Sequence, residues 1–199
     1  SILGLINIDD GEVFFKNKNI KQIPNSVFRK KIQLIFQDPY SSLNSEMSIG
    51  NSIIEPMISH QVFNSKNEMK FRALELLNQV GLSESDYNKF PNQFSGGQRQ
   101  RIVIARALAL NPEIIICDES VSALDVSIQA QILNLLSDLK EKYHFTFIFI
   151  SHDISVIKYF TDRLIILKKG EIIELNETDF LFQHPENDYT KSLLKASDF

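Results

Sequence analysis

The sequence predicts an α/β protein with a mainly parallel sheet. Residues 114–117 form an unbroken apolar run, which is typical of a strand buried on both faces. Residues 127–142 carry apolar side chains at helical spacing, and a second apolar run at residues 145–150 predicts a second buried strand. A strand, a helix and a strand in this order form a right-handed parallel crossover. Further strand signals lie towards both ends of the chain, with a helical stretch at residues 40–94.

The first part of the chain is expected to contribute strands. Residues 1–6 have the pattern of the last turn of an amphipathic helix. An Asp-Gly turn opens a predicted strand at residues 11–15, and another strand is predicted at residues 32–36. Residues 16–31 are polar and basic around Pro24, which indicates a loop and a short helix.

Residues 40–94 are expected to form a helical insertion between the two sheet-forming regions. A helix interrupted by Pro56 is predicted over residues 49–59. Residues 66–81 carry a stripe of apolar side chains at helical spacing, and Gly81 is expected to end that helix.

A third helix is predicted to begin at Gly96. Ser95 and Gln98 have the spacing of a capping box. Gly96 and Gly97 are poor helix formers, but they leave the backbone N–H groups of the first turn open at the positive end of the helix dipole. This combination predicts an anion site, with phosphate as the expected anion. A glycine-rich cap is the alternative. Residues 102–110 are apolar nearly all round, so the helix should be buried.

Two carboxylates, Asp118 and Glu119, follow the apolar run of the central strand. Burying carboxylates is costly unless they are paired or hold a metal. In open α/β sheets, ligands bind beyond the carboxyl ends of the strands. An Asp at this place can hold Mg²⁺ and a neighbouring Glu can polarise water; a strand end capped by solvated acids is the alternative.

Gln37 and His152 also follow predicted strands. The amide oxygen of a glutamine at a strand end can reach a metal or a water, although a turn residue before Asp-Pro is the alternative. The parallel crossover is expected to place His152 on the same sheet edge as Asp118 and Glu119.

The end of the chain predicts a hairpin and a helical tail. Residues 163–168 and 171–175 read as two strands turned at Lys169 and Gly170. From residue 177 the tail is expected to be helical and polar, with a break at His184 and Pro185.

Composition narrows the class of protein. Of the 199 residues, 43% are apolar, enough for a sizeable core. The net charge is −4 without a basic block, which argues against a nucleic-acid binder.

Cys117 is the single cysteine, so an intrachain disulfide is excluded. It lies in an apolar run, which favours a buried structural thiol. No apolar stretch approaches the roughly 18 residues of a membrane helix, and no signal peptide is visible, so we expect a cytoplasmic setting without a membrane span.

Together these segments resemble the nucleotide-binding subunits of ABC transporters. Five motifs occur in the family's order: the Q-loop glutamine at Gln37, the signature at residues 94–98, the Walker B strand with the catalytic glutamate at residues 114–119, the D-loop at residues 122–125, and the switch histidine at His152. Each motif alone is weak, but the set is very specific and covers essentially the whole chain.

The resemblance implies a P-loop NTPase-like fold with a helical subdomain specific to ABC proteins. Residues 1–39 would be part of a RecA-like core with the Q-loop, and residues 40–97 the helical subdomain with the signature. Residues 98–176 would complete the core with the Walker B strand, the D-loop and the switch histidine, and residues 177–199 would form a helical tail.

A narrower likeness points to the branch that imports oligopeptides and dipeptides. Residues 36–44, residues 122–131 and the tail at residues 184–194 are similar to that branch, whose close relatives import nickel.

The chain departs from the family at two places. Ser120 stands where the family usually has proline after the catalytic glutamate, which is expected to change the stiffness of the turn. No Gly-x-x-x-x-Gly-Lys-Ser/Thr occurs in the 199 residues. The P-loop and the aromatic residue that stacks on adenine are therefore expected upstream of Ser1, and the chain by itself is expected to bind ATP weakly and to be inactive alone.

In the family, two nucleotide-binding domains close head to tail on two ATP molecules. The resemblance assigns Asp118 and Gln37 to Mg²⁺, Glu119 to the attacking water, and His152 to the γ-phosphate. It assigns five residues to the nucleotide that the partner domain holds: Asp125 and the signature residues Ser95, Gly96, Gly97 and Gln98.

The implied cofactors are ATP and Mg²⁺, and the implied partners are a second ABC subunit and membrane permease subunits that contact residues 40–94. The location would be the inner face of the cell membrane. Three alternatives remain: a nickel importer subunit, a truncated non-catalytic subunit that completes a partner's ATP site, and, less favoured, an ABC ATPase of repair or translation.

Overall fold

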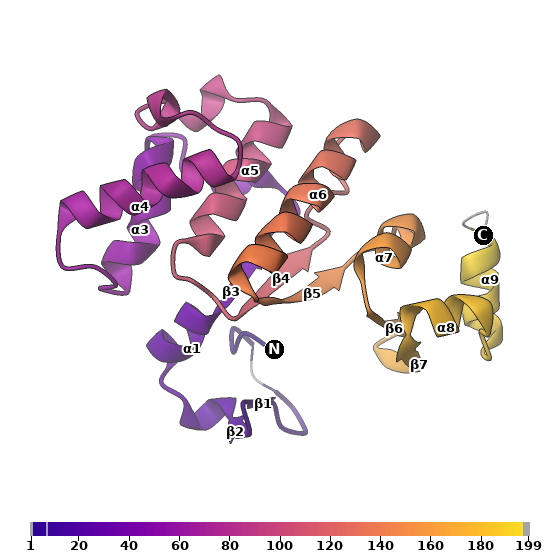
Figure 1. Cartoon of the computed structure of the whole chain (residues 1–199). Coiled ribbons are helices and arrows are strands. Elements are labelled where there is room, and N and C mark those ends of the chain that lie inside the picture. Colours follow the sequence, from indigo (N-terminus) through magenta and orange to yellow (C-terminus); the bar gives the residue numbers. More distant parts are fainter. Residues whose placement is uncertain (1, 7, 197–199) are drawn as a thin grey trace. The chain divides into compact units, whose positions relative to one another are not determined.

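The computed structural model describes residues 2–6 and 8–196 (Figure 1). The chain divides into two compact units, Ser1–Ile148 and Phe149–Phe199, and the division falls within strand β5 (Thr146–Ile150). None of the helices in these described ranges has the length and apolar character needed to cross a bilayer.

Strands β3, β4 and β5 form a three-stranded sheet in this order. Strand β3 (Ile32–Ile35) runs parallel to β4 (Ile114–Asp118), with Ile35 opposite Cys117. The three residues before Asp118 are buried, so the predicted burial of this strand on both faces is confirmed. The prediction of a second fully buried strand is wrong, because β5 lies at an edge of this sheet and its residues are half-buried or exposed.

The thiol of Cys117 belongs to the buried core, as the sequence predicts. Burial raises its pKa to about 12. Because the thiolate is the reactive form, this cysteine is an inert structural residue at neutral pH.

The segment before β3 is a small layer of turns and short elements. Strands β1 (Phe14–Phe15) and β2 (Lys18–Asn19) pair antiparallel. The 3₁₀ helix η1 (Ile20–Gln22) and the helix α1 (Asn25–Lys31) follow them. The short helix after Pro24 is thus confirmed, whereas β2 was not predicted. These elements and the sheet share a small core that contains Ile20, Phe28, Ile32 and Ile116.

The helix end expected at residues 1–6 is not observed. Residues 2–6 form turns and bends, and Gly4 has a φ of 67°. A segment this short cannot nucleate a helix by itself, and a glycine in the left-handed region ends any helical run. Ser1 and Asn7, which also belonged to this expectation and to the turn after it, lie outside the described residues.

The helical insertion has the predicted helices. Helix α3 (Ile49–Ser59) continues through Pro56, and α4 (Lys66–Gln79) ends before Gly81, whose φ is 76°. The interruption expected at Pro56 does not occur, because the buried face of α3 packs against its neighbours and offsets the lost hydrogen bond. The short elements of this region are α2 (Pro39–Ser42), η2 (Glu84–Asp86) and η3 (Pro91–Gln93).

Helix α5 (Gly96–Leu108) is the central helix of the first unit, and its predicted burial is confirmed. It contacts α2, α3, α4, α6 (Val126–Tyr143) and β3. Arg101 of α5 donates from Nη1 to the carbonyl of Val80 at 2.8 Å and so caps the end of α4. Arginine reaches a helix C-terminus favourably, because the guanidinium satisfies a carbonyl that has no partner within the helix.

The second unit is a hairpin covered by short helices. Helix α7 (Ile154–Phe160) was not predicted, whereas the hairpin of β6 (Arg163–Lys168) and β7 (Glu171–Glu177) is confirmed. The helical tail is confirmed as α8 (Thr178–Gln183) and α9 (Asp188–Ala196), except for residues 197–199, which lie outside the described residues. The core of this unit contains Ile154, Ile166, Leu181 and Leu194.

Glu113 joins three segments of the first unit just before β4. Its carboxylate forms ion pairs with Lys16, at the β1–β2 turn, and with Lys31 Nζ at 2.9 Å. Hydrogen bonds from Lys16 and then Lys31 lower the pKa of this carboxyl below its ordinary value. A carboxyl group with a lowered pKa in the folded state stabilises the fold at neutral pH, and this contribution is lost as the pH falls through that pKa.

We expect Glu113→Gln to lower the free energy of unfolding by less than about 1 kcal/mol at neutral pH, because ion pairs near the surface are screened by water. Urea denaturation should show this difference at neutral pH and a smaller one at acid pH, because protonation of the carboxyl removes its charge. A difference that is equal at both pH values, or that is unchanged by high salt, would contradict the electrostatic origin.

Candidate functional site

The acid pair lies at the carboxyl end of β4, where the strand leaves the core. Asp118 is exposed and Glu119 is half-buried. Glu119 has a φ of 46°, the left-handed region that side chains with a Cβ adopt rarely. Ser122 holds the turn after it: its N–H and its hydroxyl donate to the carbonyl oxygen of Glu119 at 3.1 and 2.8 Å.

Gln37 follows β3, the parallel neighbour of β4, and therefore emerges at the same edge of the sheet. Its side-chain Nε2 donates to the hydroxyl of Ser122 at 3.5 Å. Gln37 is thus connected through Ser122 to the backbone of Glu119. The structure brings these predicted residues together because the carboxyl ends of adjacent parallel strands meet at one edge.

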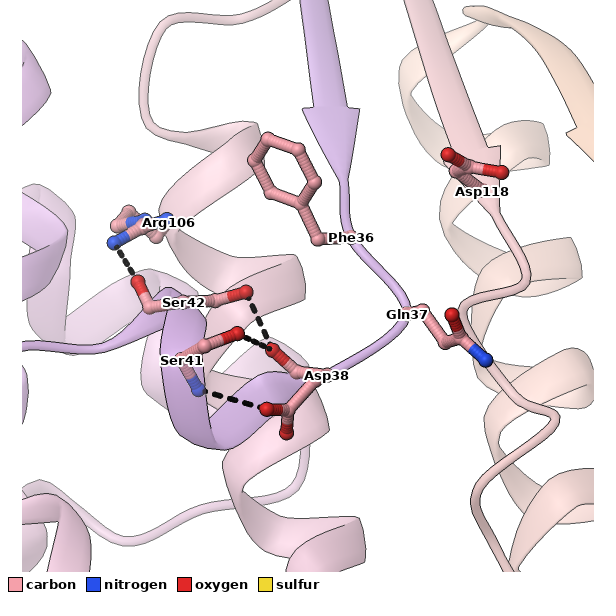
Figure 2. A pocket seen from close by; sticks show the side chains of 7 residues that line it. All are labelled: Phe36, Gln37, Asp38, Ser41, Ser42, Arg106 and Asp118. Atoms are coloured by element: carbon pink, nitrogen blue, oxygen red, sulfur yellow. Dashed lines mark hydrogen bonds between the residues drawn. The ribbon is translucent and has the colours of Figure 1, made fainter.

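A cavity of about 490 Å³ opens at this edge (Figure 2). Gln37 and Asp118 line it, together with Phe36, Asp38, Ser41, Ser42 and Arg106. Asp38 caps α2 by accepting hydrogen bonds from the N–H groups of Tyr40 and Ser41, and the bond from Tyr40 lowers the pKa of its carboxyl.

Carboxylate and amide oxygens are ligands that suit Mg²⁺, which usually takes one or two carboxylates and completes its shell with water and substrate phosphates. Asp118 and Gln37 fit this donor set. Within the described ranges no three His, Cys, Asp or Glu side chains gather to hold a metal by themselves.

The sequence interpretation missed α2 and Arg106 as parts of this edge. Asp38 followed by Pro39 is a recognisable N-cap with proline at the first helical position, so this signal was available. Arg106 lies far away in the sequence, on α5, and no local pattern indicates where its side chain reaches.

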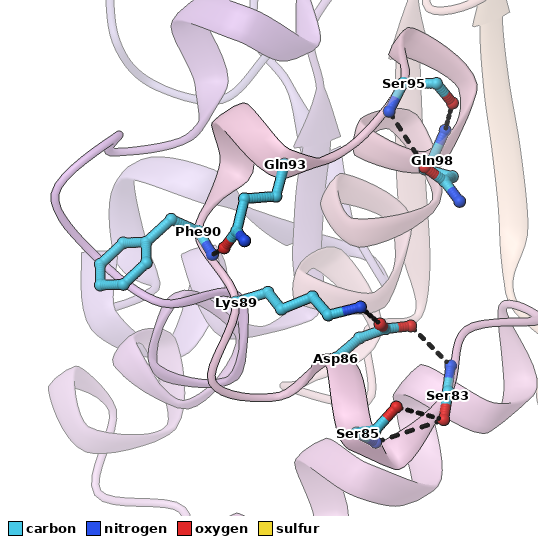
Figure 3. A network of polar contacts seen from close by, with 8 residues as sticks. All are labelled: Ser83, Ser85, Asp86, Lys89, Phe90, Gln93, Ser95 and Gln98. Atoms are coloured by element: carbon cyan, nitrogen blue, oxygen red, sulfur yellow. Dashed lines mark hydrogen bonds and ion pairs between the residues drawn. The ribbon is translucent and has the colours of Figure 1, made fainter.

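The start of α5 has the predicted capping box (Figure 3). The Ser95 hydroxyl accepts from the N–H of Gln98 at 3.3 Å, and the Gln98 side chain accepts from the N–H of Ser95 at 3.0 Å. Gly96 and Gly97 occupy the first two helical positions, whose N–H groups have no acceptor within the helix.

Packing gives Gly97 a second reason to be glycine. A Cβ added there would lie 2.5 Å from Cγ2 of Ile128 on α6, which is closer than any carbon contact allows. At Gly96 the nearest atom is Cδ2 of Leu124 at an ordinary 3.8 Å. The start of α5 therefore packs beside the loop that ends at Asp125, which is exposed and precedes α6.

His152 belongs to the second unit and is exposed. It stands directly before Asp153, the N-cap of α7, whose side chain accepts from the N–H groups of Ser155 and Val156 at 2.9 and 3.3 Å. The cap fixes the chain direction beside His152. Its approach to Asp118 and Glu119 stays a prediction.

The sequence was compared with models of known protein families, and one family matches more than half of the chain. The family described as ABC transporter matches residues 1–122. The chain belongs to the ABC transporter family.

Curated relatives extend the similarity beyond this range. The chain is 46% identical over 200 residues to the oligopeptide transport ATP-binding protein OppF of Bacillus subtilis (strain 168), covering 98% of the chain and 66% of that protein. It is 43% identical over 192 residues to the dipeptide transport ATP-binding protein DppF of Lactococcus lactis subsp. cremoris (strain MG1363), covering 95% of the chain and 62% of that protein. The chain thus spans slightly less than two thirds of the length of these relatives.

Solved structures show the same fold. CbiO1 of Clostridium perfringens, part of the ABC transporter complex cbiONQ, superposes with a TM-score of 0.82 at 26% identity, over 92% of this chain and 72% of that one. The ATP-binding cassette MJ0796, in a dimeric post-hydrolysis state bound to ADP and Pi, gives a TM-score of 0.72 at 35% identity, over 85% and 74%. The predicted P-loop NTPase-like α/β fold of the ABC ATPases is confirmed.

The two glycines of α5 give a matched test of packing. We expect Gly97→Ala to lower the free energy of unfolding by about 1–3 kcal/mol, because Ile128 must shift. Gly96→Ala should leave it unchanged or raise it by up to about 1 kcal/mol, because alanine is the better helix former. Chemical denaturation measures both variants.

Adding Ile128→Ala should remove most of the cost that is specific to Gly97→Ala, so that the double variant loses less than the sum of the two single losses. Equal effects of the two glycine substitutions would show that Ile128 does not restrict position 97.

Proposed function

We propose that this chain is part of the ATP-hydrolysing motor of an ABC importer for oligopeptides or dipeptides. The names of the relatives support the substrate class. The observation that supports the motor role most directly is the connection of Gln37 through Ser122 to Glu119, beside Asp118, at one sheet edge.

Phosphoryl transfer depends on positioning and charge neutralisation. Bound Mg²⁺ would neutralise charge on the phosphate oxygens, with Asp118 and Gln37 as its protein ligands. Glu119 would accept a proton from the attacking water as a general base, and His152 would donate a hydrogen bond to the γ-phosphate. The left-handed backbone at Glu119 redirects the chain as it leaves the strand.

A second nucleotide-binding domain would complete the site. The dimeric state of one structural relative supports this arrangement. The N–H groups at the start of α5, with Ser95 and Gln98, would bind the γ-phosphate of a nucleotide held by the partner. Asp125 and the loop before it would face the same partner, since they pack next to Gly96.

The helical segment of residues 40–94 would receive a membrane permease subunit. The chain would then act at the inner face of the cell membrane, in the cytoplasm. This assignment rests on family membership and on the transport names of the relatives.

We expect Glu119→Gln in the complete protein to reduce ATP hydrolysis by about 10²–10⁴-fold, because the base that orients the water is lost. Nucleotide binding should remain. Phosphate release and equilibrium binding of a fluorescent ATP analogue measure the two quantities separately.

Glu113→Gln is the matched control, since Glu113 lies just before the start of β4, at the end far from Glu119, and this substitution should leave hydrolysis unchanged. Near-normal turnover of the Glu119→Gln variant would overturn the assignment of the general base.

Residues 1–199 as a separate polypeptide should bind Mg-ATP far more weakly than the micromolar range, because this sequence contains no Gly-x-x-x-x-Gly-Lys-Ser/Thr to surround the phosphates. Isothermal titration calorimetry checks this expectation. Micromolar affinity for the polypeptide would contradict it.

A further inference from the structure

Gln37 is joined directly to a short, closed helix. Helix α2 begins two residues after it, and the side chain of Asp38 accepts from the N–H of Tyr40 at 2.8 Å. The hydroxyls of Ser41 and Ser42 donate back to the carbonyl of Asp38 at 3.1 and 2.7 Å. These bonds make residues 38–42 one compact piece, so any displacement of α2 also displaces Gln37.

Helix α5 holds α2 at two points. Arg106 donates from Nη1 to the carbonyl of Ser42 at 2.6 Å (Figure 2). The guanidinium of Arg99 lies 3.8 Å from the ring centre of Tyr40, while its Nε donates to the carbonyl of Pro91 at 2.7 Å. The two arginines are seven residues apart, about 10 Å along the helix. Two contacts made from different turns of α5 therefore restrain α2, one at Ser42 and one at Tyr40.

The contact of Arg106 is partly shielded from water. Its guanidinium is partly buried, and this burial lowers its pKa, opposed by the negative charge of Glu55. A charged group removed from water is held firmly by the partners it has, because losing one leaves the charge without compensation. The Arg106 contact is therefore expected to be the stronger of the two.

We propose that Arg106, assisted by Arg99, is a positioning residue that holds Gln37 against Ser122 and Glu119. The proposal rests on the proposed ATPase function. Helix α5 also begins at the segment that would bind the partner's nucleotide. A movement of α5 on contact with that nucleotide would thus move Gln37 at the chain's own site.

The arginines alternatively serve only the stability of the helical insertion. Arg101 distinguishes the two roles, because it lies on the same helix and also donates to a backbone carbonyl, but to that of Val80 at the end of α4 and not to α2. A purely structural role predicts the same behaviour for Arg101 and Arg106 variants.

The test is a double-mutant cycle in the complete protein assembled with its transporter, with kcat and KM for Mg-ATP as readouts. Arg106→Met and Gln37→Ala should each lower kcat about 10-fold, with KM within about 2-fold of the unsubstituted protein. If Arg106 acts through Gln37, the double variant should be no slower than Gln37→Ala alone. Arg106→Lys keeps the positive charge and can still donate a hydrogen bond, so it should retain part of the activity that Arg106→Met loses.

Arg101→Met is the matched control: its effect on kcat should be small and should multiply with that of Gln37→Ala. Losses from Arg106→Met and Gln37→Ala that multiply, or a Gln37→Ala variant with normal kcat, would overturn the proposal.

If Arg106→Met does not assemble, Tyr40→Leu removes only the exposed contact with Arg99 and should lower kcat about 3-fold, again without effect in the Gln37→Ala background. A Tyr40→Leu loss that persists in that background would equally overturn it.

Glu119→Gln in the same assembly separates this proposal from the proposed function. Loss of turnover in Glu119→Gln together with a multiplicative cycle would refute the positioning role alone. Normal turnover in Glu119→Gln would refute the ATPase assignment itself.

Discussion

The burial of helix α5 is the constraint on which the first unit depends. The helix packs against four other helices and strand β3, so its position determines theirs. The helices packed on α5 have backbone carbonyls at their ends that need hydrogen-bond donors. Arginines of α5 donate to two of these carbonyls, and α5 itself begins with the capping box at Ser95. One element therefore connects two places that nucleotide chemistry would use.

The parallel pairing of β3 and β4 is the second ordering element. It brings Gln37 and Asp118 to one edge, although they are far apart in the sequence. The turn around Glu119 then depends on Ser122, which bonds both to that turn and to Gln37. Strand pairing brings Gln37 and Asp118 to the same edge, and the hydrogen bonds of Ser122 then orient Gln37 and the turn at Glu119.

Much of this arrangement follows from local sequence patterns. The bounds of α3 and the start of α5 were predictable because capping residues and apolar periodicity agree there. The helix expected at residues 1–6 failed because its pattern was too short to define a helix. The full burial expected for β5 failed because exposure depends on neighbouring strands. The reach of Arg106 to Ser42 depends on tertiary packing, and the approach of Ile128 to Gly97 had no local signal either.

The burial of Cys117 gives the protein a single chemical reporter at the centre of its sheet. It is the chain's one cysteine, and its thiol is shielded and protonated in the folded state. A thiol reagent can reach it only when β4 separates from the core, so under slow labelling the modification rate follows the opening equilibrium of that strand. The labelling rate of Cys117 thus reports local opening of the sheet in the native chain, without an introduced label.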